Sequence, residues 1–357
     1  MKKYKIAFYH TDFGAGGVEK VMITYANQLA ELGFEVYAIE TRQGILDNQF
    51  SAKVKVINLN VARFRYAILK SALAFKRYKI DLVFCANINT LYVEVAKLLC
   101  NHRMKIVTSH HFYCNNSEMK WYLVSGLKYI YNQSDFVLAV SEGIEKELLY
   151  KIGVKEKKVK VLKNPININE LLVKSNEVEI NNIPAKSIMW CGRFTSVKNI
   201  PLLIDAYARI RLKYPEYILY LIGDGQDKDK IGDYVREKGL SEYVVFTGML
   251  ANPFSYLKKA SVICLSSESE AYPTILLESL SFGRTIVSTP TKGAIEILEN
   301  GRLGYLSVDF SVEEYSKALR KGIEEPMDES FLRKEVQKSN VDVVTNNLIK
   351  IFNQVMK

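Results

Sequence analysis

The chain has 357 residues, of which 48% are hydrophobic and 25% charged. At about 150 residues per domain this length predicts two domains, and the composition excludes a disordered chain. Five scattered cysteines without a C-x-x-C pair exclude a disulfide framework and favour a reducing cytoplasm. No apolar run reaches roughly 18 residues, which excludes a membrane-spanning helix. The first apolar run is broken by His10 and Asp12 and indicates a strand, not a signal peptide.

The net charge of +10 is unevenly distributed along the chain. Residues 1–163 contain 25 Lys and Arg against 14 Asp and Glu, whereas residues 164–357 contain 24 against 25. Such an asymmetry predicts a polyanionic partner for the first half of the chain. The alternative is a lysine-rich surface that faces only solvent.

The first half alternates short apolar runs with amphipathic segments. Residues 17–32 place apolar side chains at helical spacing and stop at Gly33, where a helix favours glycine. Strands that alternate with helices predict a parallel, doubly wound sheet. The expected strands are residues 3–9, 35–40, 55–59, 80–86, 105–111, 135–141 and 158–164.

The same pattern restarts after the polar stretch 164–185 and ends in a helix-rich tail. We therefore expect two doubly wound domains joined near this stretch. The default ligand site is the cleft between them, because ligands of parallel sheets bind at the carboxyl ends of the strands. The expected strands are residues 186–192, 217–223, 243–248, 261–267 and 284–289, and helices are expected at 199–214, 228–239 and about 253–259.

Glycines follow the first expected strand. Gly14, Gly16 and Gly17 lead into a helix, where a ligand can approach the backbone and free N–H groups attract an anion. A plain glycine turn is the alternative. A dinucleotide site with Glu40 as the ribose ligand is a second alternative, but Glu19 occupies the third glycine position of the G-x-G-x-x-G fingerprint.

Two histidines and two cations follow other expected strands. His110 and His111 lie at the end of the strand 105–111, where a histidine can exchange a proton near neutral pH. A histidine that only hydrogen-bonds within its loop is the alternative. Arg193 and Lys198 share the loop after strand 186–192 and together suit a diphosphate. The alternative is a pair of solvated surface cations.

Residues 267–283 combine two carboxylates with a helix start. Glu270 follows a strand, Pro273 can open a helix, and Gly283 can end it. Glu278 lies about one turn into this helix, and a carboxylate that accepts two hydroxyls suits a sugar or a ribose. The alternative is a helix-dipole carboxylate with an ordinary surface Glu. The helix start is expected to offer an anion the free backbone N–H groups of Thr274, Ile275 and Leu276.

Over nearly its whole length the chain resembles the family 4 retaining glycosyltransferases of the GT-B fold. The most specific match is the Glu-x7-Glu motif, present as EAYPTILLE from Glu270 to Glu278. Ala271 and Tyr272 depart from the usual Glu-Gly-Phe-Pro, and PTKG replaces paired glycines. The other similar segments are FGAGGVEK, AVSEG, WCGRFTSVKN, LIGDGQDKDKI and SLSFGRTIVSTPTKGAIEIL.

The resemblance implies roles for the matching residues. His111 aligns with a histidine near the anomeric carbon, with His110 as the fallback. Glu270 would bind hydroxyls of the donor sugar, and Glu278 would bind the ribose. The remaining donor-site roles fall to Gly16 and Gly17 beside the phosphate and acceptor, Arg193 and Lys198 on the diphosphate, Leu250 at the base, and the backbone of Thr274, Ile275 and Leu276.

The resemblance also implies a fold and a chemistry. It implies an α/β chain with two doubly wound Rossmann-like domains facing across a cleft. These are an acceptor domain 1–164 and a donor domain 165–335, with the helical tail 336–357 crossing back to the first. Transfer would retain the anomeric configuration. It would need no metal and no cofactor beyond a nucleotide sugar, expected to be UDP-linked, because fixed cations replace the ion.

The expected function is transfer of a hexose or N-acetylhexosamine to a lipid-linked glycan in capsule or other surface glycan synthesis. The enzyme is expected in the cytoplasm, on the inner face of the cell membrane, with no nucleic acid partner. A non-catalytic GT-B subunit serving a partner transferase is the alternative. Segments 61–79 and 119–131 suggest helices on an anionic membrane, with core helices as the alternative. Their apolar residues include Phe64, Ile68, Leu69, Phe75, Trp121, Tyr122 and Leu123.

Overall fold

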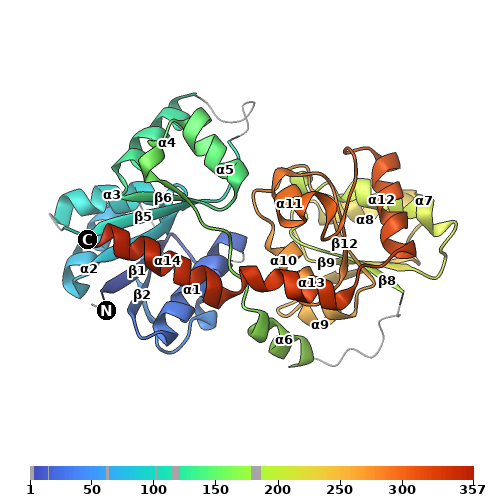
Figure 1. Cartoon of the computed structure of the whole chain (residues 1–357), viewed down its shortest axis with the longest axis horizontal. Coiled ribbons are helices and arrows are strands. Elements are labelled where there is room, and N and C mark those ends of the chain that lie inside the picture. Colours follow the sequence, from blue (N-terminus) through green and yellow to red (C-terminus); the bar gives the residue numbers. More distant parts are fainter. Residues whose placement is uncertain (1–3, 15, 62–63, 101–102, 115–120, 178–185) are drawn as a thin grey trace. The chain divides into compact units, whose positions relative to one another are not determined.

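The computed structural model describes residues 4–14, 16–61, 64–100, 103–114, 121–177 and 186–357. The chain divides into two compact units, Met1–Ile166 with Ser339–Lys357, and Asn167–Lys338. Each unit contains one sheet of parallel strands with helices packed against it (Figure 1).

Seven parallel strands form the sheet of the first unit, in the order β3-β2-β1-β4-β5-β6-β7. Most are short apolar runs, because both faces of a parallel sheet are covered. Along β1, Ile6 and Phe8 pack into one core, whereas Ala7 and Tyr9 pack into the core on the other face. The strands are β1 (Lys5–His10), β2 (Glu35–Glu40), β3 (Lys55–Asn58), β4 (Leu82–Ala86), β5 (Lys105–His110), β6 (Phe136–Ala139) and β7 (Val159–Val161).

Helices cover both faces of this sheet. Residues of α1 and α14 belong to the core that holds Ile6, and residues of α2 and α3 belong to the core that holds Tyr9. A π-helical turn, Glu147–Ile152, continues directly from α5. The helices are α1 (Gly17–Glu31), α2 (Phe64–Tyr78), α3 (Asn89–Cys100), α4 (Trp121–Gln133), α5 (Glu142–Lys146) and α14 (Val341–Val355).

The C-terminal helix α14 belongs to the first unit, although the second unit precedes it in the chain. Val344, Leu348 and Phe352 recur on one face of α14 and are buried in the core that α1 also lines. Each such side chain contributes about 1.5–3 kcal/mol by its burial. The chain re-enters this unit at Ser339, whose carbonyl accepts a 2.9 Å hydrogen bond from the N–H of Ile166. The expected return of the tail is confirmed.

Six parallel strands form the sheet of the second unit, in the order β10-β9-β8-β11-β12-β13. Leu203 of α7, Ile231 of α8 and Leu319 of α12 are buried in its core. The strands are β8 (Ser187–Cys191), β9 (Ile218–Ile222), β10 (Val244–Gly248), β11 (Val262–Leu265), β12 (Thr285–Ser288) and β13 (Tyr305–Leu306). The helices are α6 (Ile168–Glu177), α7 (Ile200–Arg211), α8 (Lys228–Glu237), α9 (Phe254–Lys259), α10 (Thr274–Ser281), α11 (Lys292–Ile297), α12 (Val312–Glu324) and α13 (Glu329–Glu335).

Each sheet reverses its strand order at one point, between β1 and β4 in the first unit and between β8 and β11 in the second. Ligands of doubly wound sheets bind outside the carboxyl ends of the strands at such a point. The α/β class with two doubly wound sheets is therefore confirmed. A ligand is expected at the carboxyl ends of the strands at these two points. Within the described ranges no helix combines the length and apolarity that crossing a membrane requires.

Candidate functional site

The loops after β8 and β11 meet at the reversal point of the second sheet. Lys198 Nζ lies 2.5 Å from Glu270 Oε1, and Ser267 Oγ donates to the same oxygen at 2.8 Å. The backbones also join, because Ser266 Oγ donates to the carbonyl of Lys198 at 2.8 Å. The side chains of Lys198 and Glu270 are only 26% and 14% exposed. The structure therefore brings together a cation and a carboxylate that the sequence placed on separate loops.

Glycines of the LIGDG segment set the position of the loop that carries Arg193. Gly223, at φ +138°, has a backbone conformation that other residues rarely adopt. A Cβ there would lie 1.9 Å from the carbonyl oxygen of Gly192. Phe194 donates its N–H to the carbonyl of Asp224 at 2.9 Å. The backbones of the two loops thus pack directly against each other, which explains why residue 223 is a glycine.

Arg193 is exposed and, among the residues that the structure describes, has no ion-pair partner. Lys198 differs because it is already paired with Glu270. An ammonium group has three donors, so Lys198 can keep Glu270 and still donate to a phosphate oxygen. The roles that the resemblance assigns to these two cations stay predictions.

The start of α10 differs in one respect from the prediction. Pro273 precedes the helix in an extended conformation, as expected. The N–H of Leu276, however, donates to the carbonyl of Pro273 at 3.2 Å, so the prediction that it is free was wrong. The first turn closes early and uses that donor. Within the described part of the chain, no hydrogen-bond acceptor reaches the N–H groups of Thr274 and Ile275.

Glu278 is almost fully buried within α10, at 8% exposure. It is therefore not an ordinary surface carboxylate, which was the alternative interpretation of this residue. Burial of a carboxylate is costly unless it has polar partners. Its predicted contact with a ribose remains a prediction.

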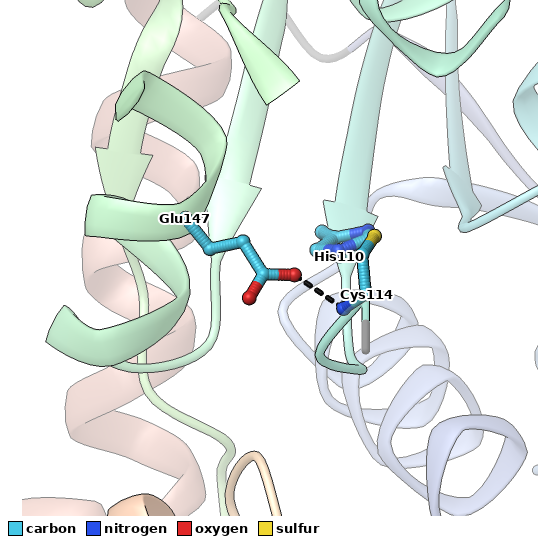
Figure 2. A group of neighbouring side chains, drawn as sticks. All are labelled: His110, Cys114 and Glu147. Carbon is cyan, nitrogen blue, oxygen red and sulfur yellow. Dashed lines mark hydrogen bonds between the residues drawn. The ribbon is translucent and has the colours of Figure 1, made fainter. Parts of the chain in front are cut away.

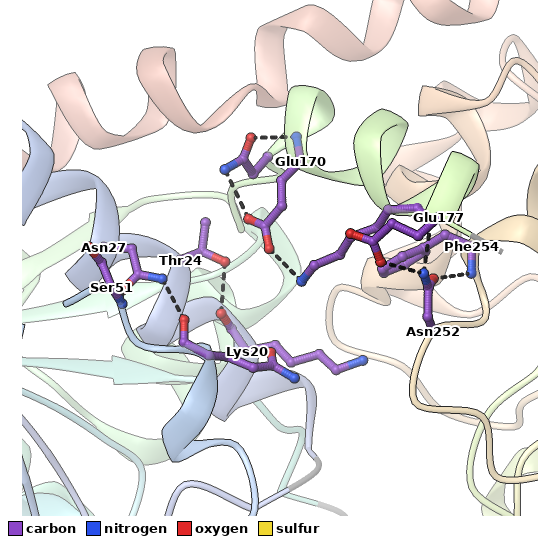
Figure 3. A network of polar contacts seen from close by, with 11 residues as sticks. Lys20, Thr24, Asn27, Ser51, Glu170, Glu177, Asn252 and Phe254 are labelled. Atoms are coloured by element: carbon purple, nitrogen blue, oxygen red, sulfur yellow. Dashed lines mark hydrogen bonds and ion pairs between the residues drawn. The ribbon is translucent and has the colours of Figure 1, made fainter.

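Leu250, the residue expected near the base, follows β10 and is half-buried. A polar network next to it fixes the loop. Asn252 Nδ2 donates to the carbonyl of Lys174 in α6 at 2.7 Å and to Glu177 at 3.2 Å, and its Oδ1 accepts from the N–H of Phe254 at 3.1 Å (Figure 3). The sequence did not predict this role for Asn252.

The end of β5 in the first unit carries His111. Its N–H donates to Asn87 Oδ1 at 3.0 Å, and its Nε2 shares a hydrogen bond of 2.8 Å with Ser109 Oγ. Burial, with smaller contributions from His110 and His10, lowers the pKa of His111 to about 3. The imidazole is therefore neutral at physiological pH, which suits a hydrogen-bonding role and not a charged one. Asn87 and Ser109 are further candidates, and single polar residues gave no signal in the sequence.

His110, the fallback that the resemblance implies for His111, is fully buried, and this role stays a prediction. Its Nδ1 forms a 2.9 Å hydrogen bond with the hydroxyl of Tyr131, itself fully buried on α4. Burial lowers the pKa of His110 to about 4, against a small opposing effect of the Phe112 backbone. The ring thus belongs to the interior of the first unit.

Gly16 and Gly17 lie at the start of α1, where the sequence placed them. The first-turn carboxylate of Glu19 folds back toward them, since a Cβ at Gly16 would lie 2.2 Å from Glu19 Oε2. The same carboxylate lies 3.8 Å from Nε2 of His10. A negative side chain thus already occupies this helix start, and the approach of a phosphate to Gly16 and Gly17 stays a prediction.

Known families match both units of the chain. The family described as "Glycosyl transferases group 1" matches residues 174–339, and "Glycosyltransferase Family 4" matches residues 15–170. The first match contains the Lys198–Glu270 pair, and the second contains His111. Gly16 and Gly17 lie in the second match, and Arg193 and Leu250 lie in the first.

Individual proteins agree with these matches. A Campylobacter jejuni protein, N-acetylgalactosamine-N,N'-diacetylbacillosaminyl-diphospho-undecaprenol 4-alpha-N-acetylgalactosaminyltransferase, is 25% identical over 372 residues, which span 99% of this chain and 98% of that protein. The lipopolysaccharide 1,6-galactosyltransferase of Salmonella typhimurium is 25% identical over 330 residues, or 87% of each chain. The crystal structure of Anabaena HepE in complex with UDP and glucose superimposes with a TM-score of 0.82 at 18% identity, over 98% of this chain and 99% of HepE. The chain belongs to the family 4 glycosyltransferases and has their GT-B fold.

Proposed function

We propose that the protein is a retaining glycosyltransferase that moves a hexose or N-acetylhexosamine from a UDP-sugar to a lipid-linked glycan. The observation that carries this proposal is the Lys198–Glu270 pair beside the two free N–H groups at the start of α10. A nucleotide sugar requires a carboxylate that accepts the sugar hydroxyls. It also requires a cation and backbone N–H donors that bind the diphosphate.

The pair also explains how a diphosphate can leave without a metal ion. Arg193 and Lys198 supply positive charge where negative charge develops on the leaving group. Glu270 orients Lys198 and is in turn held by Ser267. Addition of Mg²⁺ or Mn²⁺ to chelator-treated protein should therefore leave the transfer rate unchanged.

Retention follows from attack on the face that the leaving group vacates. The acceptor hydroxyl oxygen bonds to the anomeric carbon while the bond from that carbon to the diphosphate oxygen breaks. The departing phosphate oxygen takes the hydroxyl proton, so protons and charge balance within the two substrates. Neutral His111 would donate or accept a hydrogen bond at the sugar without supplying a charge. The anomeric configuration of the product, determined by NMR, tests this step.

The acceptor is proposed from the relatives and from charge. The Campylobacter relative is named for a diphospho-undecaprenol substrate and the Salmonella relative for lipopolysaccharide. The first of these names places a diphosphate next to a lipid, and the first half of this chain holds 25 Lys and Arg against 14 Asp and Glu. A lipid-linked acceptor in capsule or other surface glycan synthesis fits this charge.

The proposed membrane surface differs in detail from the sequence prediction. Ile68 and Phe75 of α2 are buried, so they belong to the core and not to a membrane face. The side chains of Phe64 and Trp121 lie outside the described set. Exposed apolar residues nevertheless gather on α2, α3 and α4, of which α2 contacts α3 and α3 contacts α4. These residues are Tyr66, Leu69, Leu73, Leu98, Leu99, Tyr122, Leu123 and Tyr129.

Vesicle binding tests the membrane part of the proposal. The double variant Leu69→Ser/Leu73→Ser should bind phosphatidylglycerol vesicles at least roughly tenfold more weakly, because each buried leucine contributes about 1.5–3 kcal/mol. Leu212→Ser is the matched control, since this leucine is 86% exposed in the second unit. Equal loss in the control, or no binding by the wild type at low salt, would contradict cytoplasmic peripheral binding.

A thermal-shift panel of nucleotide sugars tests the donor. A ligand at about 100 times its dissociation constant stabilises the protein by roughly 2.7 kcal/mol, which such an assay resolves. UDP-hexoses and UDP-N-acetylhexosamines should raise the melting temperature more than GDP- or ADP-sugars. If no nucleotide binds, the chain is the alternative, a non-catalytic GT-B subunit that serves a partner.

A further inference from the structure

Three potential metal ligands converge in the first unit, whereas the Lys198–Glu270 pair belongs to the second. A ring nitrogen of His110, Sγ of Cys114 and a carboxylate oxygen of Glu147 all lie within 4.8 Å of one another (Figure 2). They come from the end of β5, the loop that follows it and the π-helical turn after α5. The sequence predicted no metal-ligand cluster, because these residues belong to segments that only the fold brings together.

His110 presents a nitrogen that the protein interior does not satisfy. Nδ1 is engaged by the Tyr131 hydroxyl at 2.9 Å, whereas Nε2 is buried without a hydrogen-bond partner in the described structure. The residue is fully buried, so water does not solvate this nitrogen from outside. A buried polar atom without a partner is costly and requires an explanation. Metal-binding histidines commonly use one nitrogen for the metal and hold the other by a hydrogen bond, as Tyr131 does here.

Cys114 and Glu147 supply the anionic part of the cluster. The thiol is buried, at 1% exposure, and the carboxylate accepts a hydrogen bond from the backbone N–H of Cys114. A divalent cation bound here would hold the Cys114 sulfur as the thiolate, because a coordinating thiol is deprotonated outright.

We propose that His110, Cys114 and Glu147 bind one Zn²⁺ ion. Nitrogen, thiolate and carboxylate are the three ligand types that zinc accepts in proteins, and a thiolate with a carboxylate balances its charge. Ligand atoms around a tetrahedral zinc lie roughly 3.3–3.8 Å apart. Bringing the three ligand atoms from separations of up to 4.8 Å to these distances therefore requires side-chain shifts of about 1 Å. The fourth position is left for a water molecule.

The ion would tie the loop after β5 to the π-helical turn. This loop begins with His111, the candidate histidine at the reaction centre. Zinc would then hold the backbone that positions His111 without contacting substrate, so the site does not depend on which sugar is transferred. Arg193 and Lys198, the cations proposed for the diphosphate, belong to the second unit.

Zinc titration of the full-length protein, after chelator treatment, tests the proposal directly. We expect one equivalent to bind, with release of the Cys114 proton and a rise in melting temperature. Cys114→Ser and Glu147→Gln should each weaken Zn²⁺ affinity by more than about 100-fold, since loss of an outer-shell partner alone costs about 10–100-fold. Tyr131→Phe should weaken Zn²⁺ affinity by about 10–100-fold. Cys100→Ser and Glu145→Gln are matched controls and should bind like the wild type.

Cobalt substitution tests the thiolate ligand in the wild-type protein, with Cys114→Ser as the reference. Co²⁺ in this site should show a thiolate-to-metal charge-transfer band that Cys114→Ser lacks. A cobalt spectrum without this band would overturn the assignment. So would zinc affinity in Glu147→Gln equal to that of Glu145→Gln. None of these readouts uses glycosyl transfer, so failure of the zinc site and failure of the proposed function are distinguishable.

Discussion

Replacing Glu270 by Gln removes the charge opposite Lys198 while keeping the size of the side chain. The two side chains are 14% and 26% exposed, so solvent screens their 2.5 Å contact less than it screens a surface pair. Hydrogen bonds to charged groups contribute about 1.5–3 kcal/mol. If Glu270 holds both Lys198 and the sugar, Glu270→Gln should lower kcat/KM by roughly 10- to 150-fold.

Steady-state release of UDP from the donor identified by the thermal-shift panel measures this effect. Glu268→Gln is the control, because Glu268 is exposed and it is its backbone N–H, not its side chain, that donates to the carbonyl of Val197 in the loop after β8, at 2.8 Å. Lys198→Ala should cause a loss of at least the same size, since it also removes a phosphate donor. Equal losses in Glu268→Gln and Glu270→Gln, or an unchanged rate in Lys198→Ala, would refute the reasoning.

Two predictions concern stability. Gly293→Ala should destabilise the protein by about 1–3 kcal/mol, because a Cβ would lie 2.6 Å from the carbonyl oxygen of Ala271. Thermal melting measures this loss. Gly232→Ala is the control and should be neutral or stabilising, because the nearest atom to a Cβ there is 3.7 Å away. Burial and the neighbouring Asp47 raise the pKa of Glu40 above its ordinary value of 4.5. The folded state therefore keeps a proton that the unfolded chain has lost, so stability should fall as the pH rises from 4.5 through the raised pKa. Urea midpoints should show this slope in the wild type and a flatter one in Glu40→Gln; an identical slope in both would contradict it.

The strand-end loops were the most predictable part of the site. A short apolar run followed by Gly, Arg and Lys shows that Arg193 and Lys198 follow a strand, and parallel sheets collect such residues at one edge. Glu270 was found by the same argument. The sequence did not reveal that Lys198 and Glu270 form an ion pair, because their contact depends on the packing of β8 against β11.

The errors have local physical causes. Leu276 was predicted to offer a free N–H, but the first turn of α10 closes on Pro273 and uses it. Ile68 and Phe75 were assigned to a membrane face, yet the helical phase of α2 turns both into the core and leaves Leu69 and Leu73 outside. Composition identifies an amphipathic segment, but the contacts of the folded chain decide which face is covered.

The sequence by itself determined the class of fold, the two repeating halves and the residues at the strand ends, because hydrophobic periodicity and glycine positions are local properties. Only the tertiary structure decided which distant residues meet. It buried His110 against Tyr131 while His111 stayed at the strand end, and it brought Cys114 and Glu147 within 4.8 Å of a ring nitrogen of His110. Such contacts join elements far apart in the chain, and their energies depend on burial that no local pattern records.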